Sequence, residues 1–286
     1  MARNRSLFAA LSRRGPHRIL RGDLGFAGIS GLVYTPAAGF GLPAVAFGHD
    51  WLAGVERYTG TLEHLASWGI VAAAPDTQRG LVPSVLNLSH DLGATLDVLC
   101  SVRLGSGDIS VSPKKLGVAG HGFGGSAAVL TAAGPAGAGA CARADVRAVA
   151  AVFPSVTKPS AEAAAAGLRV PGLVLATPDD APSLRTDAAE VAAAWDGAVL
   201  RVVEKAALSG LLEKRGLAQV LGVPVPSNRT QRTIRALLTG FLLFHLTGDK
   251  KYREFADADA TFPRTSRPDP EATPPTDEER IIALFK

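Results

Sequence analysis

Apolar residues along the chain gather in short continuous runs that predict β-strands. The predicted strands are Gly31–Tyr34, Ala44–Phe47, Ile70–Ala74, Lys115–Ala119, Ala148–Phe153, Gly172–Ala176 and Val199–Val203. Most of these runs contain almost no polar residue, which is typical of parallel strands buried on both faces of a sheet. Arg18–Leu24 is a further candidate strand, and we expect it to pair with Gly31–Tyr34.

Between these runs the apolar residues recur at three- and four-residue steps, which predicts amphipathic helices. The predicted helices cover about residues 55–68, 88–99, a stretch after Phe123, 183–195 and 231–246. Strands that alternate with helices predict an α/β fold with a mostly parallel central sheet and helices on both faces.

Composition supports a large folded domain with two short extensions. The chain has 286 residues, of which 47% are hydrophobic, and this excludes a mainly disordered protein. We divide it into a basic N-terminal arm (1–15), a domain (16–256) and a proline-rich linker with a short C-terminal helix (257–286). The capping box Thr276–Glu279 starts that last helix, which either docks on its own domain or enters the groove of a partner protein.

Charge is concentrated near the N-terminus. The net charge is +4, while residues 1–25 alone carry six arginines and one aspartate. The body of the chain therefore gives no reason to expect nucleic-acid binding. The arm is interpreted as a disordered basic segment, or alternatively as a weak membrane contact through Leu7, Phe8 and Leu11.

Other features bear on the compartment. The apolar segment Leu7–Leu11 is too short for a signal peptide, and no run reaches the ~18 residues of a membrane span. Neither Cys100 nor Cys141 has a CxxC partner, so we expect no zinc site. Both cysteines are expected to be reduced and to serve in packing. A cytoplasmic location is expected.

One motif carries candidate chemistry. The predicted strand Lys115–Ala119 runs into the glycine-rich turn Gly120–Ser126 and then into a helix of small residues. A strand, a sharp turn and a closely packed helix form the context of the nucleophile elbow G-x-S-x-G.

The segment resembles the elbow of α/β-hydrolases, in particular of cutinase-like polyester hydrolases and dienelactone hydrolases. The resemblance covers about residues 16–256. The other segments that carry it are Pro43–His49, Leu65–Val71 with Pro75–Thr77, Pro171–Ala176 with the acidic loop after it, and Gly240–Leu246 with Asp249–Phe255. It implies an α/β-hydrolase fold and no cofactor.

The chain departs from that family at two of the three catalytic positions. Gly122 stands at the serine position, and Leu208 stands where the family has its histidine base. Asp180 or Asp179 occupies the position of the acid. His245 lies inside an apolar helix and is interpreted as a packing residue. Without nucleophile and base, the resemblance implies a protein that has lost serine-hydrolase catalysis.

A binding pocket is expected to remain. The backbone N–H groups of His49 and Phe123 correspond to the oxyanion hole, with Asp50, Trp51 and His121 beside it. Such a pocket can hold an acyl or ester-like ligand, unless its own side chains fill it.

Two catalytic alternatives stay open. The chain is alternatively an active carboxylic-ester or lipid hydrolase, with Ser126 as a weak candidate nucleophile. His49, His121 and either Asp50 or Asp180 offer the residue types of a metal site, but packing roles are favoured, and no metal is expected.

Overall fold

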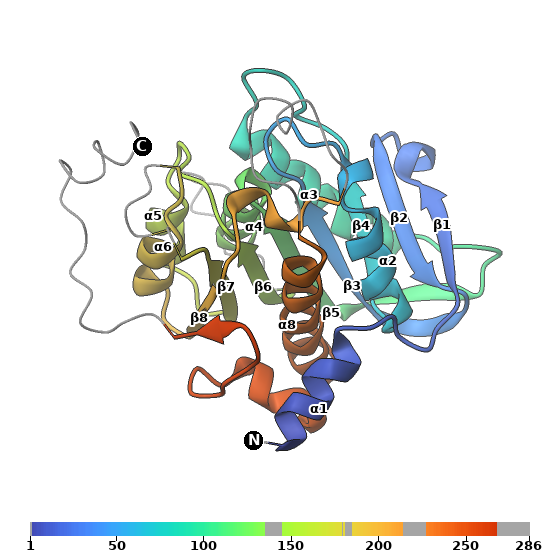
Figure 1. Cartoon of the computed structure of the whole chain (residues 1–286). Helices are drawn as coiled ribbons and strands as arrows, with labels where there is room; N and C mark the ends of the chain where they lie inside the picture. Colours follow the sequence, from blue (N-terminus) through green and yellow to red (C-terminus); the bar gives the residue numbers. More distant parts are fainter. Residues whose placement is uncertain (1, 135–144, 179, 181–184, 214–226, 268–286) are drawn as a thin grey trace.

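The computed structural model describes residues 2–134, 145–178, 180, 185–213 and 227–267. These residues form an α/β structure around one mixed, mostly parallel sheet of nine strands in the order β1-β2-β4-β3-β5-β6-β7-β8-β9 (Figure 1). The strands are β1 (Ile19–Asp23), β2 (Gly31–Pro36), β3 (Gly39–Gly48), β4 (Val71–Pro75), β5 (Ile109–His121), β6 (Val146–Val152), β7 (Gly172–Ala176), β8 (Ala198–Val203) and β9 (Thr265–Ser266).

The sheet is parallel from β4 through β8 and antiparallel at its two edges. β1 pairs with β2 from Ile19↔Pro36 onward, and this confirms the pairing expected for Arg18–Leu24. β2 runs antiparallel to β4, and β9 runs antiparallel to β8. All the predicted strands are present, but β3 and β5 extend further toward the N-terminus, where they pair with each other at Gly39↔Ile109.

Helices cover both faces of the sheet, as predicted. Helices α1 (Ala2–Leu11), α2 (Thr59–Ser67) and α8 (Asn228–Thr247) lie on one face. Helices α3 (Val85–Ser101), α4 (Phe123–Ala133), α5 (Ala161–Ala165) and α6 (Ala188–Ala194) lie on the other (Figure 1).

Side chains of the central strands alternate between the two cores. On β3, Val45 and Phe47 point into the α1/α2/α8 core, while Ala44 and Ala46 point into the opposite one. This alternation follows from the two-residue period of a strand. A strand that is buried on both sides must be apolar at every position, which explains the continuous runs in the sequence.

The N-terminal residues form a packed helix, so the expectation of a disordered arm is wrong for residues 2–11. The buried side chains of Phe8 and Leu11 on α1 face α8 and the core. The Phe8 ring stacks on Phe262 at 5.8 Å between centroids. The apolar side chains proposed for a membrane contact are therefore used in packing within the domain.

The chain beyond α8 stays attached to the domain as far as it is described. The 3-10 helix η4 (Lys250–Ala256) packs on α8, and Phe255 and Phe262 stack at 4.5 Å. The predicted helix after Thr276 lies outside the described residues, as do Asp179 and Cys141. Cys100 packs partly buried against the core, as expected. Among the helices that the structure describes, none is long and apolar enough to cross a membrane.

Candidate functional site

Gly122 lies at the apex of the turn between β5 and α4, as the sequence predicts. Its backbone has φ +54° and ψ −120°, a conformation that residues with a side chain rarely adopt. The turn is fixed by hydrogen bonds from Gly122 N–H to the Val152 carbonyl (2.9 Å) and from Ser155 N–H to the Gly122 carbonyl (3.2 Å). The apex therefore sits at the carboxyl ends of the central strands.

Helix α4 lies close against the sheet because its first residues are small. A Cβ at Gly124 would overlap the backbone of Gly48 on β3. The glycines of the predicted elbow thus permit a close approach of helix and strand, and this brings the helix N-terminus against the end of β3.

The carboxylate of Asp50 occupies the space where a side chain at position 122 would begin. A Cβ built on Gly122 would overlap Oδ1 of Asp50. Position 122 is therefore closed to an attacking side chain by two independent features, its backbone conformation and this carboxylate.

The same Asp50 carboxylate accepts the hydrogen bond that an oxyanion would take. Phe123 N–H donates to Asp50 Oδ1 at 3.0 Å, and Trp51 N–H donates to the same oxygen at 2.8 Å. The backbone donor expected for an acyl oxygen is thus satisfied by the chain's own carboxylate. The partial positive charge at the N-terminus of α4 favours an anion there.

A buried hydrogen-bonded chain supports Asp50 from below. Asp50 N–H donates to Tyr58 Oη (3.0 Å), which lies 2.9 Å from His121 Nδ1. His121 Nε2 lies 2.7 Å from the Leu208 carbonyl, which can only accept, so this nitrogen is the donor. In the neutral ring Nδ1 then accepts from the Tyr58 hydroxyl.

Burial keeps the side chains of Tyr58 and His121 in this hydrogen-bonded series uncharged. His121 and Tyr58 are fully buried. Burial lowers the pKa of His121, although the nearby Asp50 charge acts in the opposite direction. Burial also raises the pKa of Tyr58 well above its usual value, and the Asp50 charge raises it further. His121 is therefore a neutral structural residue that links β5 to the backbone at Leu208.

The remaining histidine and serine candidates are also used in structure. The fully buried His49 has its ring nitrogens 2.9 Å from the Asp50 carbonyl and 2.7 Å from the Thr77 carbonyl. The hydroxyl of Ser126 is buried and donates to the Ser155 carbonyl at 2.5 Å. The ring of His245 packs against Phe241 and Phe244.

Asp180 does not line the cavity at this site. Its Oδ2 accepts from Ala189 N–H (3.1 Å) in the first turn of α6. Burial raises the pKa of Asp180. Burial also raises the pKa of the neighbouring Asp187 to about 7, and the charges of Glu190 and Asp180 add to this shift. The structure therefore brings Gly122 and Leu208 to one cavity, whereas Asp180 lies at the first turn of α6, outside that cavity.

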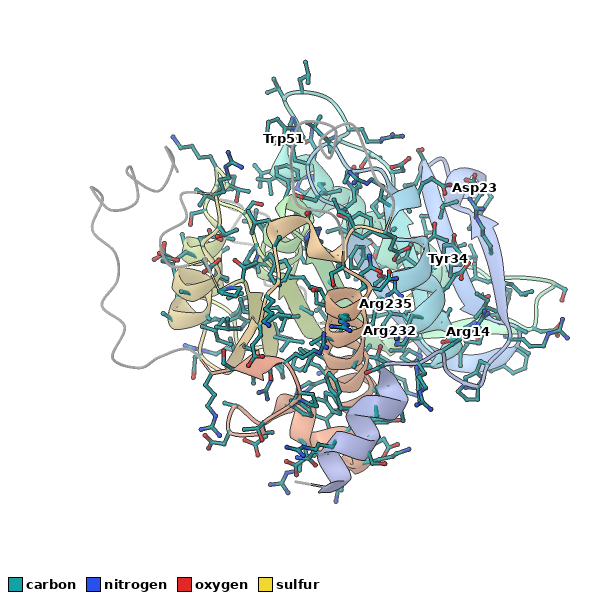
Figure 2. The ribbon with its side chains drawn as sticks, in the orientation of Figure 1. Arg14, Asp23, Tyr34, Trp51, Arg232 and Arg235 are labelled. Carbon is teal, nitrogen blue, oxygen red and sulfur yellow. The ribbon has the colours of Figure 1, made fainter. Side chains whose placement is uncertain are left out.

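A cavity of about 1220 Å³ opens above Gly122. Its lining includes the candidate residues Asp50, Trp51, Gly122, Phe123 and Leu208. Large apolar side chains on its wall are exposed to solvent, namely Trp51 (51%), Leu52 (54%) and Val156 (56%). Trp51 lies at the upper end of the molecule in Figure 2, near the loops that follow the strands. The Asp50 carboxylate thus occupies the backbone donors at the turn, but the cavity above it is open, with apolar side chains on its wall.

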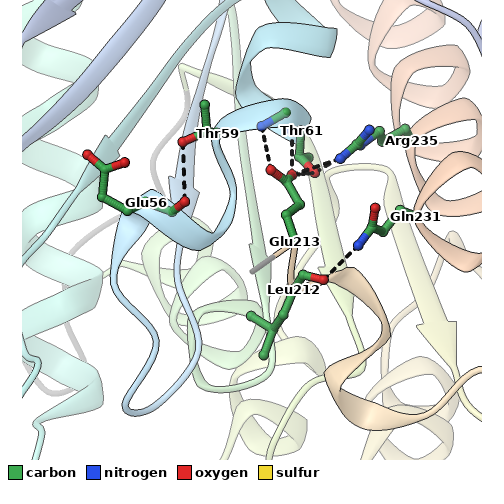
Figure 3. Close-up of polar contacts among 8 residues, drawn as sticks. Glu56, Thr59, Thr61, Leu212, Glu213, Gln231 and Arg235 are labelled. Carbon is green, nitrogen blue, oxygen red and sulfur yellow. Dashed lines mark hydrogen bonds and ion pairs between the residues drawn. The ribbon is translucent and has the colours of Figure 1, made fainter. Parts of the chain in front are cut away.

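Sequence reasoning missed two residues of this site. Tyr58 falls inside the predicted helix 55–68 without any motif of its own, yet its hydroxyl joins Asp50 to His121. Glu213 was not noted, although it anchors the segment after Leu208. Its carboxylate accepts from Gly60 N–H, Thr61 N–H and the Arg235 guanidinium at 2.5, 2.7 and 2.8 Å (Figure 3). Neither residue belongs to a local motif, so no signal in the sequence marks them.

Among the described residues, no group of three or more His, Cys, Asp or Glu side chains is arranged to hold a metal ion. Comparison with protein-family models gives no match to this chain. A search of curated proteins also finds no similar sequence.

Proposed function

We propose that this chain is a non-catalytic protein of α/β-hydrolase fold that binds an acyl or ester-like ligand in the cavity above Gly122. The geometry of the turn supports the fold. In that superfamily the nucleophile sits on a sharp turn between a strand and a helix, and the next N–H belongs to the oxyanion hole. Gly122 and Phe123 hold the equivalent places here.

The position of Asp50 is the observation that most strongly supports the proposed lack of catalysis. Its carboxylate lies where a nucleophile at position 122 would be and accepts the Phe123 N–H. An acyl carbonyl could not be polarised there without displacing a carboxylate that has two backbone donors. A bound carbonyl carbon would in addition meet no serine hydroxyl, and the Asp50 oxygen at this place is already held by two backbone N–H donors.

The alternative of an active ester hydrolase is not favoured by the positions of the other candidates. Ser126 is buried and bonded to a carbonyl, and His121 donates to another carbonyl. The two side chains thus lack the pairing of nucleophile and base that acyl transfer needs.

The open apolar wall supports ligand binding. Trp51, Leu52 and Val156 expose apolar surface on a cavity large enough for a small organic molecule. At the turn itself a carboxylate ligand would meet the Asp50 charge, so a neutral ester or alcohol with an apolar chain fits better there. Other parts of the cavity are lined by basic side chains, namely Arg57, Arg79, Lys158 and Arg185. A protein partner that inserts an apolar side chain would use the same wall.

Three measurements test the proposal. With a short-chain p-nitrophenyl ester we expect no turnover above buffer, and with a fluorophosphonate probe no labelling. Titration with methyl octanoate should change the fluorescence of Trp51 in a saturable way, and this signal should be absent in Trp51→Phe. Turnover that disappears in Ser126→Ala would overturn the loss of catalysis. An unchanged fluorescence signal would contradict the ligand class.

A further inference from the structure

A second concave region lies on the face of the sheet that α1, α2 and α8 cover. It shares no lining residue with the cavity above Gly122. It is a groove of about 780 Å³ between α1, the chain that follows α1, α2 and α8. The groove is lined by Arg5, Phe8, Ala9, Ser12, Arg13, Arg14, Gly60, Glu63, His64, Arg232, Arg235 and Pro263. Five of these residues are arginines and one is acidic.

Within the part of the chain that the structure describes, four of these arginines have no ion-pair partner. Arg235 forms an ion pair with Glu213 at 2.8 Å. Arg5, Arg13, Arg14 and Arg232 form no ion pair with any residue that the structure describes. These positive charges repel one another across the groove, and this repulsion is relieved when an anion binds.

The arginines come from segments that are held in place by packing. Phe8 and Leu11 anchor α1 in the core. The chain after α1 is fixed to α2, because Trp68 Nε1–H donates to the Arg13 carbonyl (3.0 Å) and Gly15 N–H donates to Ser67 Oγ (2.8 Å). Arg232 and Arg235 lie one turn apart on α8, where Figure 2 shows them side by side. The backbone segments that carry the arginines are therefore fixed around the groove before any ligand arrives.

A buried polar atom of the groove wall also lacks a partner. His64 lines the groove and is 6% exposed, and its Nε2 has no hydrogen-bond partner among the described residues. Buried polar side-chain atoms in proteins usually have a partner. Burial lowers the pKa of His64 to about 4, so the ring is neutral and adds no positive charge to the groove.

From these observations we infer that the groove binds a phosphate-type anion carrying two or more negative charges. The planar guanidinium group matches the oxygen geometry of phosphate and can donate two parallel hydrogen bonds to it. A single carboxylate would neutralise one of the four uncompensated arginines, whereas a diphosphate group neutralises most of them. The groove is also larger than one phosphate ion, so it has room for the group that carries the phosphate.

The ligand can be a soluble phosphate compound or the headgroup of an acidic lipid, because both offer the same chemistry. Since Phe8 and Leu11 face the core, a lipid would be recognised by its headgroup and not by insertion of α1. This inference is independent of the proposed function of the other cavity.

Calorimetric titration of the full chain with pyrophosphate in low-salt buffer tests the inference. We expect saturable binding at one site and at least tenfold weaker binding for the double variant Arg13→Gln/Arg232→Gln. Arg147→Gln, an exposed arginine of β6 outside the groove, should bind within twofold of the unchanged protein. Thermal melting without ligand verifies that the double variant folds, and we expect no loss of stability because two like charges are removed.

Sedimentation with vesicles separates the two sources. Vesicles of phosphatidic acid, a phosphomonoester lipid, and phosphatidylcholine that bind the protein and release it on addition of pyrophosphate would identify a lipid headgroup. Pyrophosphate binding without vesicle binding would identify a soluble phosphate compound. Absence of saturable pyrophosphate binding, or an equal loss of affinity in Arg147→Gln, would overturn the inference.

Discussion

Glu213 and Arg235 form a largely buried ion pair at 2.8 Å, with 14% and 17% of their side chains exposed. The carboxylate also accepts from two N–H groups of the first turn of α2 and from the Thr61 hydroxyl (Figure 3). One side chain thus joins α2, α8 and the segment that follows Leu208. This arrangement connects the segment after Leu208 with two of the helices that form the arginine groove.

We expect Glu213→Gln to destabilise the protein by about 2 kcal/mol or more, because it leaves the Arg235 charge partly buried without a counter-charge. Glu56→Gln is the matched control. Glu56 pairs with Arg21 at 2.9 Å, but both side chains are more than half exposed. Its loss should cost less than about 1 kcal/mol. Urea unfolding measures both, and equal effects would contradict the structural role of Glu213.

Gly122 should tolerate no side chain. Gly122→Ala combines an unfavourable φ with an overlap of its Cβ with Asp50, so we expect a loss of about 3 kcal/mol or more. Gly41→Ala separates the two effects, because Gly41 also has a positive φ (+62°) but open space around its Cβ position. It should cost about 1 kcal/mol. Similar losses for the two variants would show that Asp50 does not fill the site.

Asp50→Ala should open the oxyanion position. The variant leaves the N–H groups of Phe123 and Trp51 without their acceptor at the N-terminus of α4. We expect octanoate to bind this variant at least tenfold more tightly than the unchanged protein, as measured by Trp51 fluorescence. Asp50→Asn is the control. It keeps a side-chain oxygen that can accept both hydrogen bonds, so it should gain little affinity.

The stability of the folded chain should depend on pH through Asp187. Burial raises the pKa of Asp187 from 3.8 to about 7, so the folded state holds a proton that the unfolded state has released. Its contribution to stability is complete below about pH 4 and is lost as the pH rises through 7. The slope is at most about 1.4 kcal/mol per pH unit.

Asp187→Asn removes this group and should flatten the pH dependence of urea unfolding between pH 4 and 7. The comparison with the unchanged protein isolates Asp187 from the histidines, since burial lowers the pKa values of His64 and His245 to about 4 and their effect has the opposite sign. An identical slope in both proteins would contradict a protonated Asp187.

The sequence predicted most of the fold because its signals are local. The strands from Ile70 onward read as continuous apolar runs, and the helices on either side have clear three- and four-residue spacing. Helix α1 was missed because it is short, basic and flanked by no capping signal. It folds as a helix because Phe8 and Leu11 have a surface of α8 and Phe262 to pack on.

The candidate site also has features that the sequence predicts and features that depend on tertiary packing. The apex at Gly122 follows from the local pattern of strand, glycine turn and helix. The glycine and the leucine that stand where the resemblance to α/β-hydrolases would place a serine and a histidine are likewise read from the sequence alone. The position of the Asp50 carboxylate depends on where the end of β3 lies relative to the start of α4, 73 residues later in the chain. The Tyr58–His121–Leu208 chain and the groove formed by α1, α2 and α8 likewise join distant segments. Side-chain type and spacing are properties of the sequence, whereas the filling of a site and the gathering of charges depend on how separate elements pack, so only the tertiary structure decides them.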